Sequence, residues 1–252
     1  MSVDLKVLQQ LIDARITQQA LDARAIPVDM SIEQAYLCQT QMIQQYVYQN
    51  ATRQTGWKVA LSGKAAQAKY GLQYPVYGHL CADMQLKKGS DLELKQFYQP
   101  KLEIELAFTL KEAIAEIALT DAELLDKVEH IRPAIEIADT RWLNWQCNLG
   151  QFLMDNSAAR AYILGDISNV SVYTLDIQHI LEHSNVDVTV TTQPEDQPIH
   201  NYLWLVRKLL AQGKRLQAGE VILTGSIIRP IELQKGNYQF QLLGQNLALN
   251  VI

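Results

Sequence analysis

Two segments near the start of the chain carry apolar residues at helical spacing. In the first they recur three or four positions apart, at Leu5, Leu8, Ile12 and Ile16. The second follows the stretch "AIPVD" and opens with Ser31 and Gln34, an S-x-x-Q pattern that is typical of a capping box at a helix start. This periodicity predicts a helical arm over residues 1–50.

From residue 56 onward the pattern changes to short apolar runs that are separated by glycine and polar residues. Such runs are typical of β-strands joined by turns. We predict strands over residues 57–61, 76–80, 101–110, 131–138, 161–165, 186–192, 220–225, 238–243 and 247–252.

Helical patterns interrupt these strands twice. One helix is predicted to start at the capping box of Thr120 and Glu123, and the other spans residues 199–213. No low-complexity linker divides the chain. The pattern therefore predicts an α+β fold, with a mixed β-roll or sandwich body over 51–252 behind the helical arm and a single domain over 1–252.

The segment "PKLEIELAF" alternates apolar and acidic residues, so its two faces differ in a strand. One face carries Leu102, Ile104, Leu106 and Phe108. The other face carries Glu103 and Glu105. The segment "IRPAIEIADTR" repeats this pattern, because Glu136 points away from Ile135 and Ile137 and shares its face with two alanines. We expect the apolar faces of both strands to be buried.

Two interpretations of the three glutamates are open at this point. Each glutamate could lie on a polar strand face in water. Alternatively, the carboxylates converge, and then they repel one another unless a cation or protons intervene. Oxygen ligands alone suit a hard cation such as Mg²⁺, which keeps water or substrate oxygens at its remaining positions.

Composition and charge narrow the classes of protein that remain. The chain has 252 residues, of which 48% are hydrophobic and 19% charged, so a folded core is expected. A net charge of -5 without a lysine and arginine cluster argues against a nucleic-acid partner. Apolar runs are too short to cross a membrane, and the start lacks a signal-peptide core. The scattered Cys38, Cys81 and Cys147 indicate reduced thiols, and we expect a cytoplasmic protein.

Six segments, in their order and spacing, resemble the fumarylacetoacetate hydrolase superfamily: "GWKVALSGKAAQ", "PVYGHLCADM", "PKLEIELAF", "PAIEIADTR", "DNSAARAYILG" and "GEVILTGS". Within it, the likeness is to the branch of 2-keto-4-pentenoate hydratases and 4-oxalocrotonate decarboxylases, over nearly the whole chain. The resemblance implies a fold of the fumarylacetoacetate hydrolase type and a small 2-keto acid or its dienol as substrate in aromatic catabolism. It also implies a homo-oligomer, with a complex with a pathway enzyme as a further option.

The resemblance also implies roles for individual residues. Glu103, Glu105 and Glu136 would bind Mg²⁺ or Mn²⁺, and Lys58 would be the active-site lysine. A keto acid would chelate the ion, which would stabilise the enolate as a Lewis acid. Contacts with substrate would come from Ser62, Lys64, Asn156, Ser157, Thr224, Gly225 and Ser226.

Lys58 also has a physical case of its own. It lies between Trp57 and Val59 in a predicted strand, which is a poor place for a charge that is merely solvated. Such a lysine could neutralise a substrate carboxylate or, with a pKa lowered by burial, move a proton. The alternative is a lysine at a strand edge whose stem extends its charge to water.

The sequence departs from the family pattern at three places, one of which is Asp196, Gln197 and Pro198, where relatives usually carry Gly-His-Pro. Val76 stands where relatives in the hydratase branch usually carry an aspartate, and Ala158 and Ala159 replace a pair of serines. Three functions therefore stay open. They are hydration of a 2-hydroxypenta-2,4-dienoate-like acid, decarboxylation of a 4-oxalocrotonate-type acid, and a weakly active metal-binding paralogue that serves as an assembly subunit.

The helical arm offers slight support of its own for an oligomer. Tyr46, Val47 and Tyr48 are neighbours on the second predicted helix, so apolar surface would face more than one side of that helix. Exposed apolar surface of this kind often packs against a partner. We therefore expect the arm to contact a second copy of the chain.

Overall fold

The computed structural model describes residues 5–26, 29–175, 181–191 and 198–252. Within these ranges the main sheet has eight strands in the order β2-β1-β8-β4-β5-β6-β3, with β9 paired to β4. Its members are β1 (Gln54–Ala60), β2 (Val76–Cys81), β3 (Gln85–Leu86), β4 (Lys101–Leu110), β5 (Val128–Ala138), β6 (Ala159–Leu164), β8 (Val221–Leu223) and β9 (Ile231–Glu232). A smaller sheet joins β7 (Leu181–Ser184), β10 (Gly236–Leu242) and β11 (Gln245–Val251).

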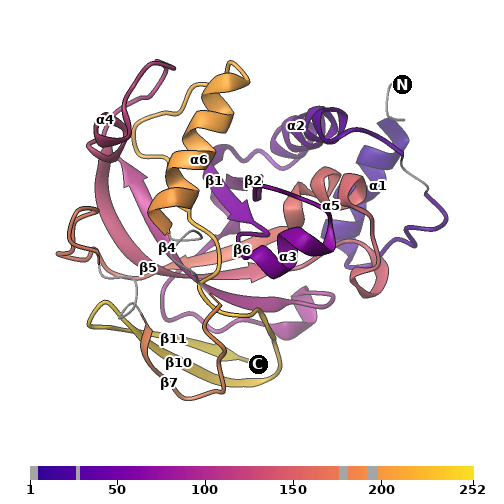
Figure 1. Cartoon of the computed structure of the whole chain (residues 1–252). Coiled ribbons are helices and arrows are strands. Elements are labelled where there is room, and N and C mark those ends of the chain that lie inside the picture. Colours follow the sequence, from indigo (N-terminus) through magenta and orange to yellow (C-terminus); the bar gives the residue numbers. More distant parts are fainter. Residues whose placement is uncertain (1–4, 27–28, 176–180, 192–197) are drawn as a thin grey trace.

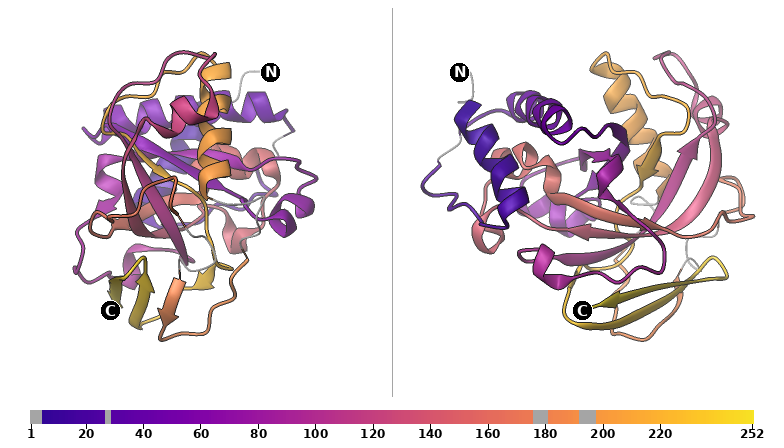
Figure 2. Two further views of the ribbon diagram at one scale, coloured as in Figure 1. Left: turned by 60° about the vertical axis from the view of Figure 1, so that its left-hand side comes forward. Right: turned by 180° about the vertical axis from the view of Figure 1, so that it is seen from behind.

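Helices pack on both faces of the main sheet, and the small sheet lies below the main sheet in Figures 1 and 2. The α-helices of the described ranges are α1 (Leu5–Thr17), α2 (Ile32–Gln49), α3 (Lys64–Lys69), α4 (Asp121–Leu125), α5 (Leu149–Met154) and α6 (Pro198–Ala211). Short 3-10 turns are η1 (Ala82–Met84), η2 (Leu94–Gln96), η3 (Leu143–Trp145) and η4 (Asn156–Ala158). Because β1 runs parallel to β8 and antiparallel to β2, the sheet is mixed, and the predicted α+β class is confirmed.

The apolar faces of β4 and β5 lie in the core, as their alternation predicted. The buried side chains are Leu102, Ile104, Leu106, Phe108, Ile135 and Ile137. The ring of Phe108 lies 5.5 Å from that of Tyr202 on α6, between ring centroids. On the opposite face, Ala107 and Ala134 belong to a hydrophobic cluster that includes Leu8 of α1 and other residues of the arm. The carboxylate-bearing face is therefore closed at its alanine end.

The N-terminal arm forms two helices, and the capping box of Ser31 and Gln34 is present. The expectation about its apolar surface is wrong for Tyr46, which is buried with the guanidinium of Arg15 at 5.0 Å from its ring centroid. The exposed aromatic residue is Tyr48. A homo-oligomer stays a prediction. No helix in the described ranges is long and apolar enough to cross a membrane.

One predicted strand is wrong. Within the described part of residues 186–192, backbone pairing is limited to a single bridge between Val190 and Ile228. The strand that pairs with β10 at this edge is β7, which comes earlier in the chain. Because β10 already has β7 and β11 as neighbours, alternating valines at 186, 188 and 190 find no free edge there.

Candidate metal centre

The register of β4 and β5 brings the three glutamates together. Glu103 lies directly opposite Glu136 in this antiparallel pair, and Glu105 is two positions along the same face. Opposite residues in an antiparallel pair project from the same side of the sheet. One carboxylate oxygen from each of the three lies within 4.8 Å of the others. The predicted convergence of Glu103, Glu105 and Glu136 is confirmed.

Burial makes this convergence costly for the charged carboxylates. Glu105 and Glu136 are buried, and Glu103 is half-buried, so the interpretation as a solvent-exposed strand face is excluded for the first two. Burial and the charge of Glu136 raise the pKa of Glu103 to about 7, against the opposing effect of Lys58 and Lys101. Burial, Glu136 and Glu103 raise the pKa of Glu105 well above its ordinary value.

The unsatisfied oxygen atoms of this cluster fit a hard cation. Glu105 Oε1 and Glu136 Oε2 are buried and accept no hydrogen bond, and Glu136 Oε1 has an ion pair with Lys58 as its contact. A buried charge of this kind is unfavourable unless a cation and further ligands compensate for it. Only oxygen donors are present in the cluster, which is the ligand type that Mg²⁺ and Mn²⁺ accept.

Lys58 contacts the cluster from β1. Its Nζ lies 3.0 Å from Glu136 Oε1 in an ion pair, and it donates a hydrogen bond of 3.2 Å to the carbonyl of Ser157. The side chain is buried, so the alternative of a lysine that reaches water is wrong. Burial alone lowers the pKa of Lys58, but Glu136 and the other two carboxylates raise it above its ordinary value. The expected lowering does not occur while the carboxylates remain charged.

The turn that follows β8 supports Glu105. The amide and hydroxyl groups of Thr224 both donate to the Leu106 carbonyl, at 3.0 and 2.9 Å. The amide of Gly225 then donates to Glu105 Oε2 at 2.8 Å. Gly225 has a φ of +93°, and a Cβ there would lie 2.7 Å from that of Ser62. Glycine is thus required by both backbone conformation and space.

Ser62 and Ser226 lie against each other at this turn. The Ser62 hydroxyl approaches the Ser226 carbonyl at 3.5 Å, and the Ser226 hydroxyl donates to the Ile228 carbonyl at 2.8 Å. Lys64 is exposed at the first residue of α3, so it is not part of the buried group. Among the predicted substrate-side residues, Gly225 contacts Glu105 directly, and Ser62 packs against Gly225.

Asn156 and Ser157 use their side chains to hold β2. The Asn156 side chain accepts from the His79 amide at 2.7 Å and donates to the His79 carbonyl at 2.8 Å. The Ser157 hydroxyl donates to the Tyr77 carbonyl at 2.7 Å. What Ser157 offers to the candidate centre is its backbone carbonyl, which binds Lys58. Their predicted contact with substrate has no such support.

Three successive residues of η4 adopt left-handed backbone conformations. Their φ angles are +51° for Asn156, +50° for Ser157 and +59° for Ala158. For residues other than glycine this conformation is energetically unfavourable, and several such residues in a row persist only where surrounding contacts hold them. Gly78 permits the approach, since a Cβ there would lie 2.5 Å from the Asn156 carbonyl oxygen. The strain is thus stored next to the group that holds Lys58.

The departures from the family pattern at Val76, Ala158 and Ala159 are buried, whereas Asp196 and Gln197 lie outside the described residues. Val76 pairs with Ala60 on β1, and Lys58 pairs with Gly78, so Val76 projects from the same face as Lys58. The face that bears Lys58 thus carries an apolar group at this position. Ala158 and Ala159 are buried in the core and offer no hydroxyl.

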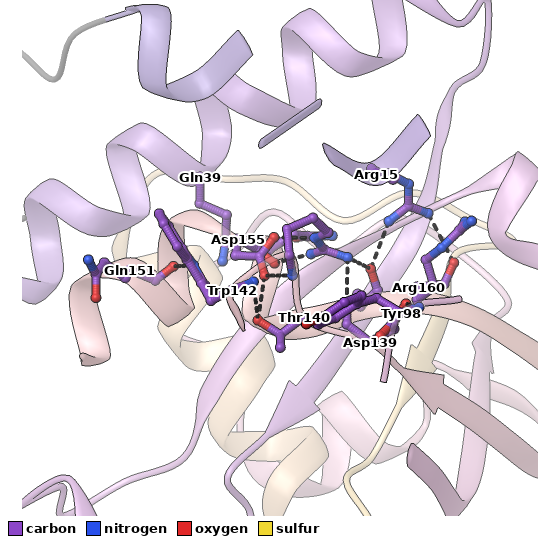
Figure 3. Close-up of polar contacts among 12 residues, drawn as sticks. Arg15, Gln39, Tyr98, Asp139, Thr140, Trp142, Gln151, Asp155 and Arg160 are labelled. Atoms are coloured by element: carbon purple, nitrogen blue, oxygen red, sulfur yellow. Dashed lines mark hydrogen bonds and ion pairs between the residues drawn. The ribbon is translucent and has the colours of Figure 1, made fainter. Parts of the chain in front are cut away.

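Sequence reasoning missed a buried ionic network behind η4 (Figure 3). Asp155 accepts hydrogen bonds from the Thr140 hydroxyl at 2.9 Å, from the Arg141 amide at 2.8 Å and from the Arg141 guanidinium. Arg15 of the helical arm donates to the carbonyls of Ala159 and Arg160, both at 2.9 Å. The charged residues of "DTR" and "DNS" follow or precede strand-like segments, but nothing in the sequence shows that they meet.

A mixed sheet that carries three converging glutamates beside a buried lysine defines an α+β protein with a candidate divalent-metal centre. No family model matches the chain. It is 31% identical over 180 residues to the TodF product hydratase of Pseudomonas putida, covering 69% of this chain and 67% of that protein. It is 30% identical over 228 residues to the 2-oxo-hept-4-ene-1,7-dioate hydratase of Escherichia coli, covering 85% of each.

Solved structures share the fold at lower sequence identity. The structure of 4-oxalocrotonate decarboxylase from Pseudomonas putida G7 gives a TM-score of 0.86 at 20% identity, over 98% of this chain and 97% of that one. Fumarylpyruvate hydrolase from Pseudomonas aeruginosa gives 0.56 at 16% identity, over 79% and 89%. The sequence relatives show that the chain belongs to the family of the 2-keto-4-pentenoate hydratases, and the solved structures show that it has the fold of the fumarylacetoacetate hydrolase type. The resemblance found in the sequence is confirmed.

Proposed function

We propose that this protein is a hydro-lyase that adds water to a small 2-hydroxydienoate, the enol form of a 2-keto acid. In this proposal Glu103, Glu105 and Glu136 hold one divalent cation. The observation that carries it is the set of buried, unsatisfied carboxylate oxygens beside Lys58. Names of the sequence relatives support the reaction, since several are 2-keto-4-pentenoate hydratases.

A divalent cation held by the three glutamates would supply Lewis-acid stabilisation of negative charge on the keto-acid oxygens. Mg²⁺ is our first choice and Mn²⁺ the alternative, because the ligands are oxygen atoms only. Related folds have been solved with magnesium, with calcium and with manganese. Glu105 would be oriented for this role by the Gly225 amide, and Glu136 by Lys58.

Lys58 would balance charge and move a proton. Three carboxylates and one divalent cation leave a net charge of about -1, which repels a keto-acid anion. The ammonium group of Lys58 brings the site close to neutrality before the substrate binds. Held between Glu136 and the Ser157 carbonyl, it is fixed in position to deliver a proton to the dienol and to take one from the incoming water.

A second candidate reaction is decarboxylation of a 4-oxalocrotonate-type acid. Val76 supports it, because a buried apolar group stands on the Lys58 face where hydratases of the family usually carry an aspartate. A relative with this activity by name, from a Pseudomonas species, is 26% identical over 195 residues. An apolar wall favours loss of a charged carboxylate as neutral carbon dioxide.

The test supplies Mg²⁺ with 2-hydroxypenta-2,4-dienoate and with 4-oxalocrotonate, and follows dienol absorbance and released carbon dioxide. Loss of absorbance without carbon dioxide identifies the hydratase, whereas release of carbon dioxide identifies the decarboxylase. Absence of both, with metal bound, would leave the assembly-subunit interpretation.

Two variants test the roles of the residues. Lys58→Met should abolish turnover but keep Mn²⁺ binding, whereas Glu105→Gln should lose both. Lys111→Met is the matched control, because Lys111 is exposed at the far end of β4. If Lys58→Met retains most of its rate, the proposed role of the lysine fails.

A further inference from the structure

The face of β4 that carries Glu103 and Glu105 continues to Lys101. Positions 101, 103 and 105 project from the same side of the strand. Glu105, Glu136 and Lys58 are buried, whereas Glu103 and Lys101 are half-buried. Access to the cluster from solvent is therefore easier at the end of β4 where Lys101 lies.

A cavity of about 390 Å³ begins at this end of the strand. Its polar lining comes from Lys101, Gln99, Asn144, Trp145, Glu232 and Gln234. None of the three glutamates of the cluster lines it, so it lies beyond the reacting end rather than at it.

Lys101 is held in place, and its ammonium group interacts with Glu103 at longer range without forming an ion pair. Its Nζ lies 4.4 Å from the centroid of the Trp145 ring, and the Trp145 ring nitrogen donates to the Gln99 carbonyl at 3.0 Å. No carboxylate of the described residues lies within ion-pair distance of this ammonium group. Glu232 is opposite Lys101 in the register of β9, but its side chain is exposed, so water and salt screen its charge.

We propose that this cavity binds the distal carboxylate of a dicarboxylic 2-keto acid and that Lys101 recognises it. The inference rests on the proposed function, because it takes the keto-acid end of the substrate to lie at the glutamate cluster. Two strand positions separate Lys101 from Glu103, about 6.8 Å between Cα atoms, a spacing that a chain of several carbons can cover.

The charge balance favours the same class of substrate. With a divalent cation and Lys58, the glutamate cluster is close to neutral before substrate binds, so it has no positive charge left over for a second carboxylate, which needs a further cation. Lys101 supplies it, and the amides of Gln99 and Gln234 offer hydrogen-bond donors beside it. By name, relatives of the chain act on acids with one carboxylate and on acids with two. Lys101 assigns this chain to the second group.

The experiment compares two dienols in the presence of Mg²⁺, 2-hydroxypenta-2,4-dienoate and 2-hydroxyhepta-2,4-diene-1,7-dioate. We expect the wild-type protein to have the higher kcat/KM for the dicarboxylate. Lys101→Met should lower the ratio of the two kcat/KM values at least tenfold, mainly through KM for the dicarboxylate, and Lys101→Arg should restore most of it. Glu232→Gln should raise the ratio, because it removes the one negative charge that lines the cavity.

A binding measurement keeps this inference separate from the proposed reaction. Titration calorimetry with adipate and with hexanoate, both with Mg²⁺ present, requires no turnover. Adipate should bind more tightly than hexanoate to the wild-type protein, and Lys101→Met should remove that difference while Lys111→Met keeps it. An equal loss for both ligands in Lys101→Met, or no loss, would overturn the assignment. Failure of turnover with the adipate preference intact would instead count against the proposed reaction.

Discussion

Two buried groups of charges differ in how they are satisfied. Asp155 has no exposed surface, yet its two oxygens accept hydrogen bonds from Thr140 and from the backbone and guanidinium of Arg141. Glu105 and Glu136 are equally buried, but Glu105 Oε1 and Glu136 Oε2 accept no hydrogen bond, and Lys58 is the one cation that pairs with either residue among the described residues. The first group is complete within the chain. The second group is complete only when a charge arrives from outside.

This difference indicates that the Asp155 network is structural and that the glutamate cluster is a binding site. A satisfied buried ion pair holds its surroundings in one arrangement, whereas unsatisfied like charges destabilise the fold in exchange for binding. The two groups are linked through η4, because Asp155 directly precedes Asn156 and Ser157, and the Ser157 carbonyl holds Lys58. We infer that the network of Asp155 and Arg141 maintains the strained backbone on which Lys58 depends.

The largest effect is expected from breaking the satisfied group. Asp155→Asn leaves the buried guanidinium of Arg141 without its counter-charge, which should lower the free energy of unfolding by about 3–5 kcal/mol. Urea denaturation measures this loss. Asp166→Asn is the control, because its ion pair with Lys88 is largely exposed and should contribute less than about 1 kcal/mol. Equal losses in the two variants would mean that Asp155 is not a structural anchor.

A smaller change in the free energy of unfolding is expected when pH is varied in the metal-free protein, and it comes from the unsatisfied glutamate cluster. Glu103 has a pKa of about 7 in the folded chain against an ordinary 4.5, and the pKa of Glu105 is also raised, so the folded state binds protons more tightly than the unfolded state. The free energy of unfolding should therefore fall by roughly 1–3 kcal/mol as pH rises from about 5 to 8. Below pH 4.5 both states are protonated and this contribution is complete.

Metal and a variant isolate the cause of that pH dependence. Excess Mg²⁺ should remove most of the fall, because the cation compensates for the ionised carboxylates. Glu105→Gln should reduce the fall in metal-free protein and also remove the stabilisation by Mg²⁺. Thermal denaturation at several pH values, with and without Mg²⁺, is the measurement. A metal-free protein that becomes more stable from pH 5 to 8 would contradict the account of the glutamate cluster.

Features that depend on neighbouring residues in one strand could be predicted from the sequence, whereas contacts between distant segments could not. Alternation along a single strand identified the buried faces of β4 and β5 and put Glu103 and Glu105 on one face, because strand geometry fixes the side of each residue. That Glu136 joins them came from the resemblance to a known family, since pairing between two strands leaves no local pattern. The pairing of Arg141 with Asp155 depends on where a loop and a helix end meet in space. No periodicity records that, and the strand predicted at residues 186–192 failed for the same reason: sheet edges are a property of the whole fold.

The smallest effect is expected at Ser157, where a substitution separates a structural role from contact with substrate. The resemblance to the family implied that its hydroxyl contacts substrate, but that hydroxyl donates to the Tyr77 carbonyl within a buried contact. Ser157→Ala removes this hydrogen bond and should lower the free energy of unfolding by about 1 kcal/mol. Because the backbone carbonyl that binds Lys58 remains, kcat/KM should change less than about threefold. The stability change comes from urea denaturation and the rate change from the dienol assay. A loss of activity of a hundredfold or more without loss of stability would mean that the Ser157 hydroxyl contacts substrate and is not structural.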